Sequence, residues 1–374
     1  MSARAWADID LGAVAHNVRA LRTLVAPARL CAVVKANGYG HGAAAVGRAA
    51  LQAGADWLAV AQVHEAVSLR DAGIDAPVLV LAEPRPDEVD DAVDTGARLT
   101  LYTPAAVEAV ARAARRRRRP PVAVHVKVDT GMHRVGCDPD DLLDVAGAVD
   151  KRPELVLEGV LTHLPVADEP ANPYTDGQLD RFDALVADLR GAGLDPPIVH
   201  AANSAGAIVH PRARYDLVRC GIAIYGIPPA PAFDGRVDLH PALTLATEVS
   251  FVKRVAAGEA VSYGHRHRFE RDTVVATVPI GYADGVFRAL PLAGQEALVG
   301  GRRRPMVGVV TMDQLMIDCG ADATVRTGDP VVLLGAQGDE RITPDEWAAR
   351  LGTISYEVVC AIGPRVARRY RAGR

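Results

Sequence analysis

The chain has 374 residues, 49% of them hydrophobic and 24% charged, and a formal net charge of −4 at pH 7. This composition is ordinary for a soluble globular protein, the length suits one large and one smaller domain, and the negative charge argues against a general nucleic-acid binder. No apolar run reaches the roughly 18 residues of a transmembrane helix, and the charged N-terminus lacks the apolar core of a secretory signal. We therefore expect a cytoplasmic protein that binds neither membrane nor nucleic acid.

The cysteines give no sign of a disulfide framework or a metal centre. Five of them stand far apart and form no Cys-X-X-Cys pair: Cys31, Cys137, Cys220, Cys319 and Cys360. An odd number at wide spacing indicates reduced thiols. We therefore expect no metal ion in the site.

Short β-rich runs alternate with amphipathic segments from about residue 30 to 227. The predicted strands are 30–35, 57–61, 78–81, 99–102, 122–128, 157–164, 198–202 and 217–225. The predicted helices between them include 43–53, 65–72, 86–93, 105–115, 140–149 and 178–190. Alternation of strand and helix favours a parallel sheet, and eight such strands suit a closed (β/α)₈ barrel of the TIM type. The arginine run 115–119 then predicts a solvated helix end.

The pattern changes after a proline-rich linker at residues 227–231. Short alternating strands with glycine turns follow, at 243–255, 273–280, 306–310, 315–318 and 331–334, with one helical segment at 345–351. The arginines 302–304 follow two glycines and predict an exposed hairpin. We therefore expect an α/β protein whose barrel, residues 1–238, precedes a mostly β domain, residues 239–374.

A lysine at the end of the first predicted barrel strand is the first candidate for catalysis. Lys35 ends an apolar run and is followed by Gly38, Tyr39 and Gly40. Burial at a strand end disfavours the charged form of a lysine, and a neutral amine is what a Schiff base with an aldehyde requires. Glycines let the backbone approach a ligand closely. The alternative is a solvent-exposed lysine before a flexible turn.

Further polar or glycine-rich groups end the other predicted strands, where barrel enzymes place their active residues. These groups are Lys127, His163, Asn203–Ser204 and Arg219–Ile222. The last strands of barrels commonly form a phosphate site, which Ser204 and the backbone amides of Gly221 and Ile222 would supply. A reactive lysine beside a phosphate site suggests pyridoxal phosphate as the cofactor.

The segment from Lys35 to Gly42 resembles the cofactor-lysine motif of bacterial alanine racemases. Similar segments continue in order along nearly the whole chain, at 127–136, 162–163, 200–204, 219–226, 261–264, 281–285, 312–314 and 354–357. The resemblance implies a pyridoxal-phosphate barrel followed by a β domain, and an isomerase that interconverts L- and D-alanine. It also implies a homodimer with shared active sites, and a role in D-alanine biosynthesis, which supplies a peptidoglycan precursor.

The resemblance implies a role for each matching residue. Lys35 would carry the cofactor as an aldimine and act as one base, and Tyr263 would be the second base, on the opposite face of the substrate. The residues implied to hold the cofactor are Lys35, Tyr39, His163, Asn203, Ser204, Arg219, Gly221, Ile222 and Tyr356. Those implied to bind the substrate or narrow its entrance are Arg134, Met312, Asp313 and Tyr282. Lys127 matches a lysine that is often carbamylated in this family and orients the substrate-binding arginine.

The sequence departs from the family's usual pattern in the residues that follow His163 and Gly285. The first departure lies beside an implied site residue and bears on substrate preference. Three alternatives stay open: a racemase of another small amino acid such as serine, an amino-acid decarboxylase that shares the barrel, and a non-catalytic carrier of pyridoxal phosphate. A pocket built for alanine discriminates poorly against one added hydroxyl.

Overall fold

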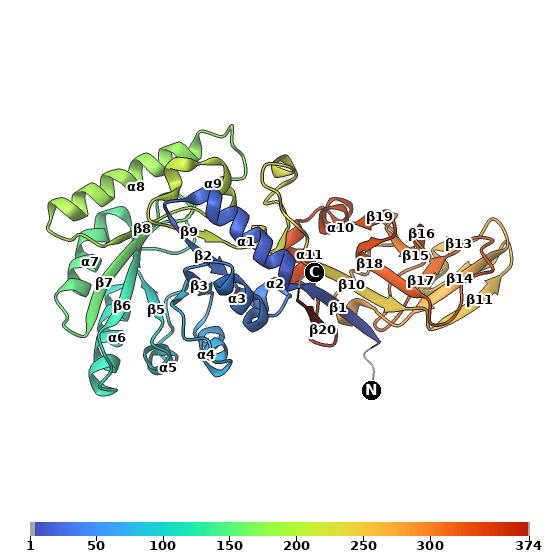
Figure 1. Ribbon diagram of the computed structural model, residues 1–374, viewed down its shortest axis with the longest axis horizontal. Coiled ribbons are helices and arrows are strands. Elements are labelled where there is room, and N and C mark those ends of the chain that lie inside the picture. Colours follow the sequence, from blue (N-terminus) through green and yellow to red (C-terminus); the bar gives the residue numbers. More distant parts are fainter. Residues whose placement is uncertain (1–3, 373–374) are drawn as a thin grey trace. The chain divides into compact units, whose positions relative to one another are not determined.

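A computed structural model describes residues 4–372 of the chain as two compact units (Figure 1). The barrel unit contains residues 13–38 and 42–240. The β unit contains the described residues up to Gly12, the short stretch Tyr39–His41, and the chain from Pro241 onward. None of the helices in the described residues is both long and apolar enough to cross a membrane.

Eight parallel strands form the sheet of the barrel unit, in the order β8-β7-β6-β5-β4-β3-β2-β9. Their bounds are β2 Arg29–Val33, β3 Trp57–Val60, β4 Val78–Val80, β5 Arg98–Leu101, β6 Val122–Lys127, β7 Leu155–Leu161, β8 Ile198–His200 and β9 Leu217–Cys220. Backbone hydrogen bonds from Asp216 to Val199 and from Arg219 to Ala202 bring the two outer strands together. The predicted eight-stranded barrel is thus confirmed.

Helices surround this sheet, because most residues of its strands are buried on both faces and need cover outside (Figure 1). They are α1 Leu11–Val25, α2 Lys35–Tyr39, α3 Ala43–Gln52, α4 Val63–Asp71, α5 Val89–Asp94, α6 Pro104–Arg116, α7 Leu142–Asp150, α8 Tyr174–Gly191 and α9 Ser204–Val209. Short 3₁₀ turns add η1 Pro139–Asp141, η2 Pro211–Arg214, η3 Ile222–Tyr225 and η4 Pro231–Phe233. The arginines that end α6 pair with acidic side chains at the surface, so the predicted solvated helix end is confirmed.

The last barrel strand is shorter than predicted. We expected a strand over 217–225, but β9 ends at Cys220 and the chain turns into η3. Gly221 has φ −103° and ψ −94°, which breaks the extended path. Tyr225 in η3 is buried and its hydroxyl donates to the Val33 carbonyl of β2 at 2.9 Å. The residues of η3 are therefore part of the barrel core. Their sequence is apolar for that reason, and an apolar run is also what a buried strand shows.

The β unit is built on one ten-stranded sheet with the path β11-β14-β17-β16-β15-β18-β10-β1-β20, and β19 pairs with β18. Its strands are β1 Ala5–Asp10, β10 Leu243–Glu248, β11 Phe251–Val255, β14 Thr273–Val278, β15 Glu296–Val299, β16 Arg302–Val307, β17 Leu315–Asp318, β18 Pro330–Gln337, β19 Glu340–Ile342 and β20 Ala367–Arg371. The rest comprises the pair β12 Ala260–Val261 and β13 His267–Arg268, the helices α10 Pro344–Leu351 and α11 Ser355–Cys360, and the turns η5 Tyr263–His265 and η6 Tyr282–Asp284.

Three features of the β unit differ from the sequence-based expectation. The single strand expected over 243–255 is two strands, because β10 pairs with β1 and β18 whereas β11 pairs with β14. The N-terminal strand β1 was not predicted. It lies between β10 and β20, two strands that are far from β1 in the sequence. The hairpin at 302–304 is present, but Arg304 is largely buried against Asp322 rather than exposed.

Removing the N-cap of α6 tests how this helix is held. The hydroxyl of Thr103 accepts from the Ala106 N–H at 3.2 Å and donates to Glu83 Oε1 at 2.8 Å. We expect Thr103→Ala to lower the free energy of unfolding by about 1–2 kcal/mol, because both contacts are lost. Urea denaturation followed by circular dichroism measures this. Thr103→Ser keeps the hydroxyl and should stay near wild type; equal losses in both variants would contradict the capping role.

Candidate active site

Lys35 opens a left-handed turn at the end of β2. Ala36, Asn37 and Gly38 have φ values of 52°, 51° and 63°. The left-handed conformation costs an L-residue about 1–2 kcal/mol. The Ala36 N–H donates to Glu65 Oε1 at 2.5 Å, which holds the turn in place. The backbone that carries the Lys35 side chain is therefore strained and fixed, not the flexible turn of the alternative hypothesis.

Glu65 ties this turn to the next barrel loop. Its Oε2 accepts from the N–H groups of Ala61 and Gln62 at 2.8 and 3.0 Å, just after β3. One carboxylate thus receives three backbone donors from two successive strand ends. The sequence reasoning missed Glu65, since a glutamate in the first turn of a helix usually acts only as part of a cap.

Lys127 is the last residue of β6 and is only 7% exposed. Burial lowers its pKa from 10.5 to about 8, and the charges of Arg219 and Arg134 add to the effect. The one nearby carboxylate, Asp129, already accepts from the N–H groups of Gly131 and Met132. Lys35 also contributes to the shift. Four cations thus share one strand-end region with little counter-charge, which suits binding of phosphate and carboxylate groups.

Arg219 lies in β9 and is buried, with hydrogen bonds on both terminal nitrogens. Nη1 contacts His200 Nδ1 at 2.9 Å, and Nη2 donates to the carbonyls of Thr162 and Ala201 at 2.9 and 2.8 Å. Nη2 also lies 3.2 Å from His163 Nδ1. Within residues 4–372, the Nε–H has no hydrogen-bond partner. That donor is available to an acceptor outside the protein.

His163 follows β7 and is held neutral by its surroundings. Burial lowers its pKa well below 6.5, and the positive charges of Arg219 and Lys127 add to this. A neutral imidazole whose Nδ1 faces a guanidinium accepts there and carries its proton on Nε2. His163 therefore has one N–H donor left for a second partner.

Ser204 lies beside the start of η3, where the sequence predicts a phosphate site, but the Gly221 amide named in that prediction is already used by Ser204. The Ser204 hydroxyl accepts from the Gly221 N–H at 2.9 Å and keeps its own O–H to donate. Asn203 caps α9 through the Gly206 N–H at 3.0 Å and donates to the Leu164 carbonyl at 3.0 Å. The Asn203 side chain therefore shapes this predicted phosphate site. In the described chain the N–H of Ile222 is unpaired, so it adds a second donor.

Tyr39 and Tyr356 lie together in the β unit. Their ring centroids are 6.2 Å apart and the rings are tilted by 50°. The close approach depends on Gly40, whose φ is 79° and where a Cβ would lie 2.3 Å from the Val359 carbonyl oxygen. Burial raises the pKa of Tyr39, and Tyr356 adds to the shift, so Tyr39 is a neutral phenol that donates a hydrogen bond.

Tyr263 is 73% exposed, in the short turn η5. The turn is held by Ser262, which has a φ of 67° and whose hydroxyl donates to the Val309 carbonyl at 3.1 Å. A Cβ on Gly308 would lie 2.4 Å from Ser262 Cβ, so this contact requires glycine there. The backbone that presents the Tyr263 phenol is thus fixed although the side chain is solvated.

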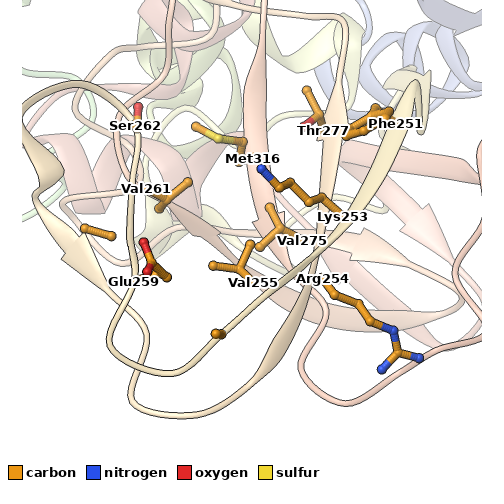
Figure 2. A pocket seen from close by; sticks show the side chains of 12 residues that line it. Phe251, Lys253, Arg254, Val255, Glu259, Val261, Ser262, Val275, Thr277 and Met316 are labelled. Carbon is orange, nitrogen blue, oxygen red and sulfur yellow. The ribbon is translucent and has the colours of Figure 1, made fainter.

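A cavity of about 410 Å³ adjoins this turn, on the face of β11 and β14 (Figure 2). Val255, Val261, Val275 and Met316 form its apolar wall, and Lys253 points into it (Figure 2). None of the predicted site residues lines it. It is therefore separate from the candidate active site.

The implied substrate-binding residues of the β unit are brought together by backbone contacts. The N–H groups of Tyr282 and Ala283 donate to the carbonyls of Thr311 and Met312 at 3.0 and 3.1 Å. The Asp313 carboxylate pairs with Arg365 at 2.7 Å. The negative charge of Asp313 is therefore neutralised within the protein. Arg134, in the barrel unit, is exposed and forms no ion pair within residues 4–372.

These features define a parallel barrel that carries a lysine near other cations at its strand ends, followed by a C-terminal β domain that exposes a tyrosine. Residues 9–229 match the family described as "Alanine racemase, N-terminal domain", and residues 242–370 match "Alanine racemase, C-terminal domain". The chain belongs to the alanine racemase family.

Individual relatives match over their full length. An alanine racemase of Symbiobacterium thermophilum is 50% identical over 98% of this chain and 96% of its own. The crystal structure of alanine racemase from Bacillus anthracis with bound L-Ala-P has a TM-score of 0.93 at 38% identity, and the match covers 99% and 96% of the two chains. A histidine racemase from Leuconostoc mesenteroides subsp. sake has a TM-score of 0.91 at 30% identity, covering 99% and 98%.

The low pKa of Lys127 predicts a pH-dependent stability. The lysine titrates near pH 8 when folded and near 10.5 when unfolded, so the unfolded state binds more protons between these values and stability rises with pH there. Below pH 8 the buried lysine is charged, and this lowers the free energy of unfolding by its full amount, on the order of 3 kcal/mol. We expect Lys127→Met to stabilise the cofactor-free protein at pH 7 and to remove the rise, in urea titrations under CO₂-free buffer. Lys151→Met, at an exposed lysine, is the control; an unchanged slope in Lys127→Met would contradict this.

Proposed function

We propose that this protein is a pyridoxal-phosphate-dependent alanine racemase that uses Lys35 and Tyr263 as its two bases. The observation that carries the proposal is the placement of Lys35 on a strained, fixed turn at the cationic end of the barrel. Membership of the alanine racemase family supports the reaction and the substrate.

The free donors of the barrel unit fit the cofactor. An aromatic ring nitrogen needs a donor, and Arg219 Nε–H has no partner in the described chain. A phosphate needs donors, and the Ser204 hydroxyl and the Ile222 N–H at the start of η3 supply two, while the Gly221 N–H is already used by Ser204. In this proposal, Tyr39 and Tyr356 complete the phosphate site with their hydroxyls. The barrel domain, residues 1–238, holds the cofactor through Lys35, Ser204 and Arg219, and the C-terminal domain, residues 239–374, contributes the Tyr356 hydroxyl and the tyrosine base.

When bound, pyridoxal phosphate supplies an electron sink that stabilises negative charge at the substrate's α-carbon. The protein's own task is to move one proton. Lys35 Nζ takes or gives the α-proton on one face, and the Tyr263 hydroxyl does so on the other, so both enantiomers have a base. Arg134 and the Met312 backbone hold the substrate carboxylate, and Tyr282 narrows the entrance. Arg219 disfavours protonation of the ring nitrogen, which limits side reactions such as transamination.

A chiral assay tests the reaction and its substrate. Purified protein with added pyridoxal phosphate is incubated with L-alanine, and in parallel with L-serine and L-histidine, since a histidine racemase shares the fold. We expect rapid formation of D-alanine and much slower reaction of the others. Faster reaction of serine or histidine would reassign the substrate. A protein that binds the cofactor but racemises none of them would be a carrier.

Tyr263→Phe tests the two-base assignment. Loss of one general base should lower racemisation by about 10²- to 10⁴-fold. Exchange of the α-proton with solvent deuterium, followed by NMR, should survive for the enantiomer that Lys35 serves and be lost for the other. Tyr370→Phe, at another partly exposed tyrosine of the β unit, is the matched control. Equal loss of exchange for both enantiomers would contradict the assignment.

We also propose that Lys127 is carbamylated. Its pKa, lowered to about 8, leaves a large share of the amine neutral near pH 8, and neutral amines attack CO₂ to give a carbamate and one proton. The new anion would pair with Arg134 and balance the cations around it. With ¹³C-bicarbonate we expect a slowly exchanging carbamate NMR signal that Lys127→Met lacks and Lys151→Met retains. A signal that persists in Lys127→Met would contradict the proposal.

We propose that the protein acts as a homodimer. Large apolar side chains of the β unit are exposed, among them Phe251 at 58%, Met312 at 53% and Ile354 at 61%. Together with Tyr263 they form a set of apolar groups that a second copy would cover. Light scattering across a concentration series tests this. We further place the enzyme in the cytoplasm, where D-alanine would serve as a peptidoglycan precursor, on the ground of its family.

A further inference from the structure

A continuous chain of hydrogen bonds runs through the barrel interior from Arg219 to Glu158. Arg219 Nη1 lies 2.9 Å from His200 Nδ1, and His200 Nε2 lies 2.8 Å from His125 Nδ1. His125 Nε2 then lies 3.1 Å from Glu158 Oε2. Both imidazoles are fully buried. Barrel interiors are normally filled by branched apolar side chains, so a polar chain in this place needs a specific reason.

The barrel backbone is adapted to this chain. A Cβ on Gly159 would lie 2.3 Å from His125 Nδ1, so only glycine admits the ring there. The register between β6 and β7 also shifts between Val124 and His125. The His125 ring packs edge-on against Trp57 and against His200, with centroids 5.5 and 5.0 Å apart. A missing side chain and a strand irregularity thus coincide at the same histidine.

The two charged ends set the direction of every hydrogen bond. A guanidinium only donates, so His200 accepts at Nδ1 and carries its proton on Nε2. That proton is donated to Nδ1 of His125, which therefore carries its own proton on Nε2 and donates it to the Glu158 carboxylate. Burial lowers the pKa of both histidines, so each is neutral and has a single defined tautomer.

Glu158 is itself anchored at the amino-terminal end of the barrel strands. Its Oε2 lies 3.1 Å from Nε of Arg98, the first residue of β5. The Arg98 guanidinium lies over the Trp57 ring, 4.8 Å from its centroid. Although burial would raise the pKa of Glu158, the His125 hydrogen bond and the charge of Arg98 lower it, so the carboxylate is ionised. Glu158 and Arg219 are therefore opposite charges that do not touch and are joined by the two neutral imidazoles of His125 and His200.

We propose that Glu158, acting through His125 and His200, is a positioning residue for Arg219. The relay fixes the plane of the guanidinium and retains its charge inside the barrel, where none of the carboxylates of residues 4–372 contacts it directly. This inference rests on the proposed function in one respect, namely that Arg219 faces the ring nitrogen of the cofactor. Without Glu158, no acceptor holds the proton of His125 on Nε2, so His125 can adopt either tautomer. His200 can then carry its proton on Nδ1, where it would face the Arg219 guanidinium as a second donor.

Glu158→Ala in the holoenzyme tests the relay with two readouts. The first is the ¹⁵N NMR of histidine-labelled protein, with His125 and His200 assigned by substitution. We expect both in the Nε2–H form in wild type and a mixture of tautomers in the variant. The second is the ratio of transamination to racemisation with alanine, which should rise by about tenfold, the size of a charged hydrogen bond. Glu158→Gln keeps an acceptor and should lie between the two.

Glu154→Ala is the matched control, because Glu154 precedes the same strand and pairs with Arg115 outside the chain of hydrogen bonds. It should leave both readouts unchanged. Unaltered tautomers in Glu158→Ala would overturn the relay, and altered tautomers with an unaltered ratio would overturn its action on Arg219. If Glu158→Ala fails to fold, Glu158→Gln decides between the same outcomes. A wild-type protein that racemises no alanine would refute the proposed function, while the tautomer readout would still test the relay.

Discussion

The rest of the candidate site depends on one constraint, the concentration of positive charge at one end of a barrel. Lys127 and Arg219 are buried there, and the charges of Arg219, Arg134 and Lys35 act on Lys127. Burying cations without direct counter-ions is costly, and in this protein the cost appears as lowered pKa values of Lys127 and Arg219. The same field attracts phosphate and carboxylate groups.

Two carboxylates that lie away from the proposed reacting groups fix the positions of the site residues. Glu65 receives three backbone N–H groups and keeps the turn after Lys35 left-handed. Glu158 reaches Arg219 only through two histidines. Neither carboxylate neutralises a site cation by direct contact. The barrel thus keeps its charge at the strand ends while its geometry is fixed by groups outside the site.

Much of the fold follows from local pattern. The eight barrel strands were predictable because each is a short apolar run bounded by turn residues and followed by a helical repeat. The run 243–255 was wrongly predicted as a single strand, since both halves contain β-branched residues and only their different partner strands separate them. The strand β1 and the helix α1 were missed. Buried Val14, Val18, Leu21 and Val25 do follow a helical period, so that signal was present in the sequence.

The sequence by itself determined the type of chemistry: a lysine at a strand end, a serine–glycine anion cradle and an ordered set of family motifs. It did so because strand ends and glycine turns are local features. Only the tertiary structure decided which side chains support them. His125 was one of two polar residues, with Lys127, in an otherwise apolar strand, and its link to Glu158 and His200 needs β6, β7 and β8 side by side. Long-range pairing set those contacts, and no local sequence signal encodes a hydrogen bond between residues 75 positions apart.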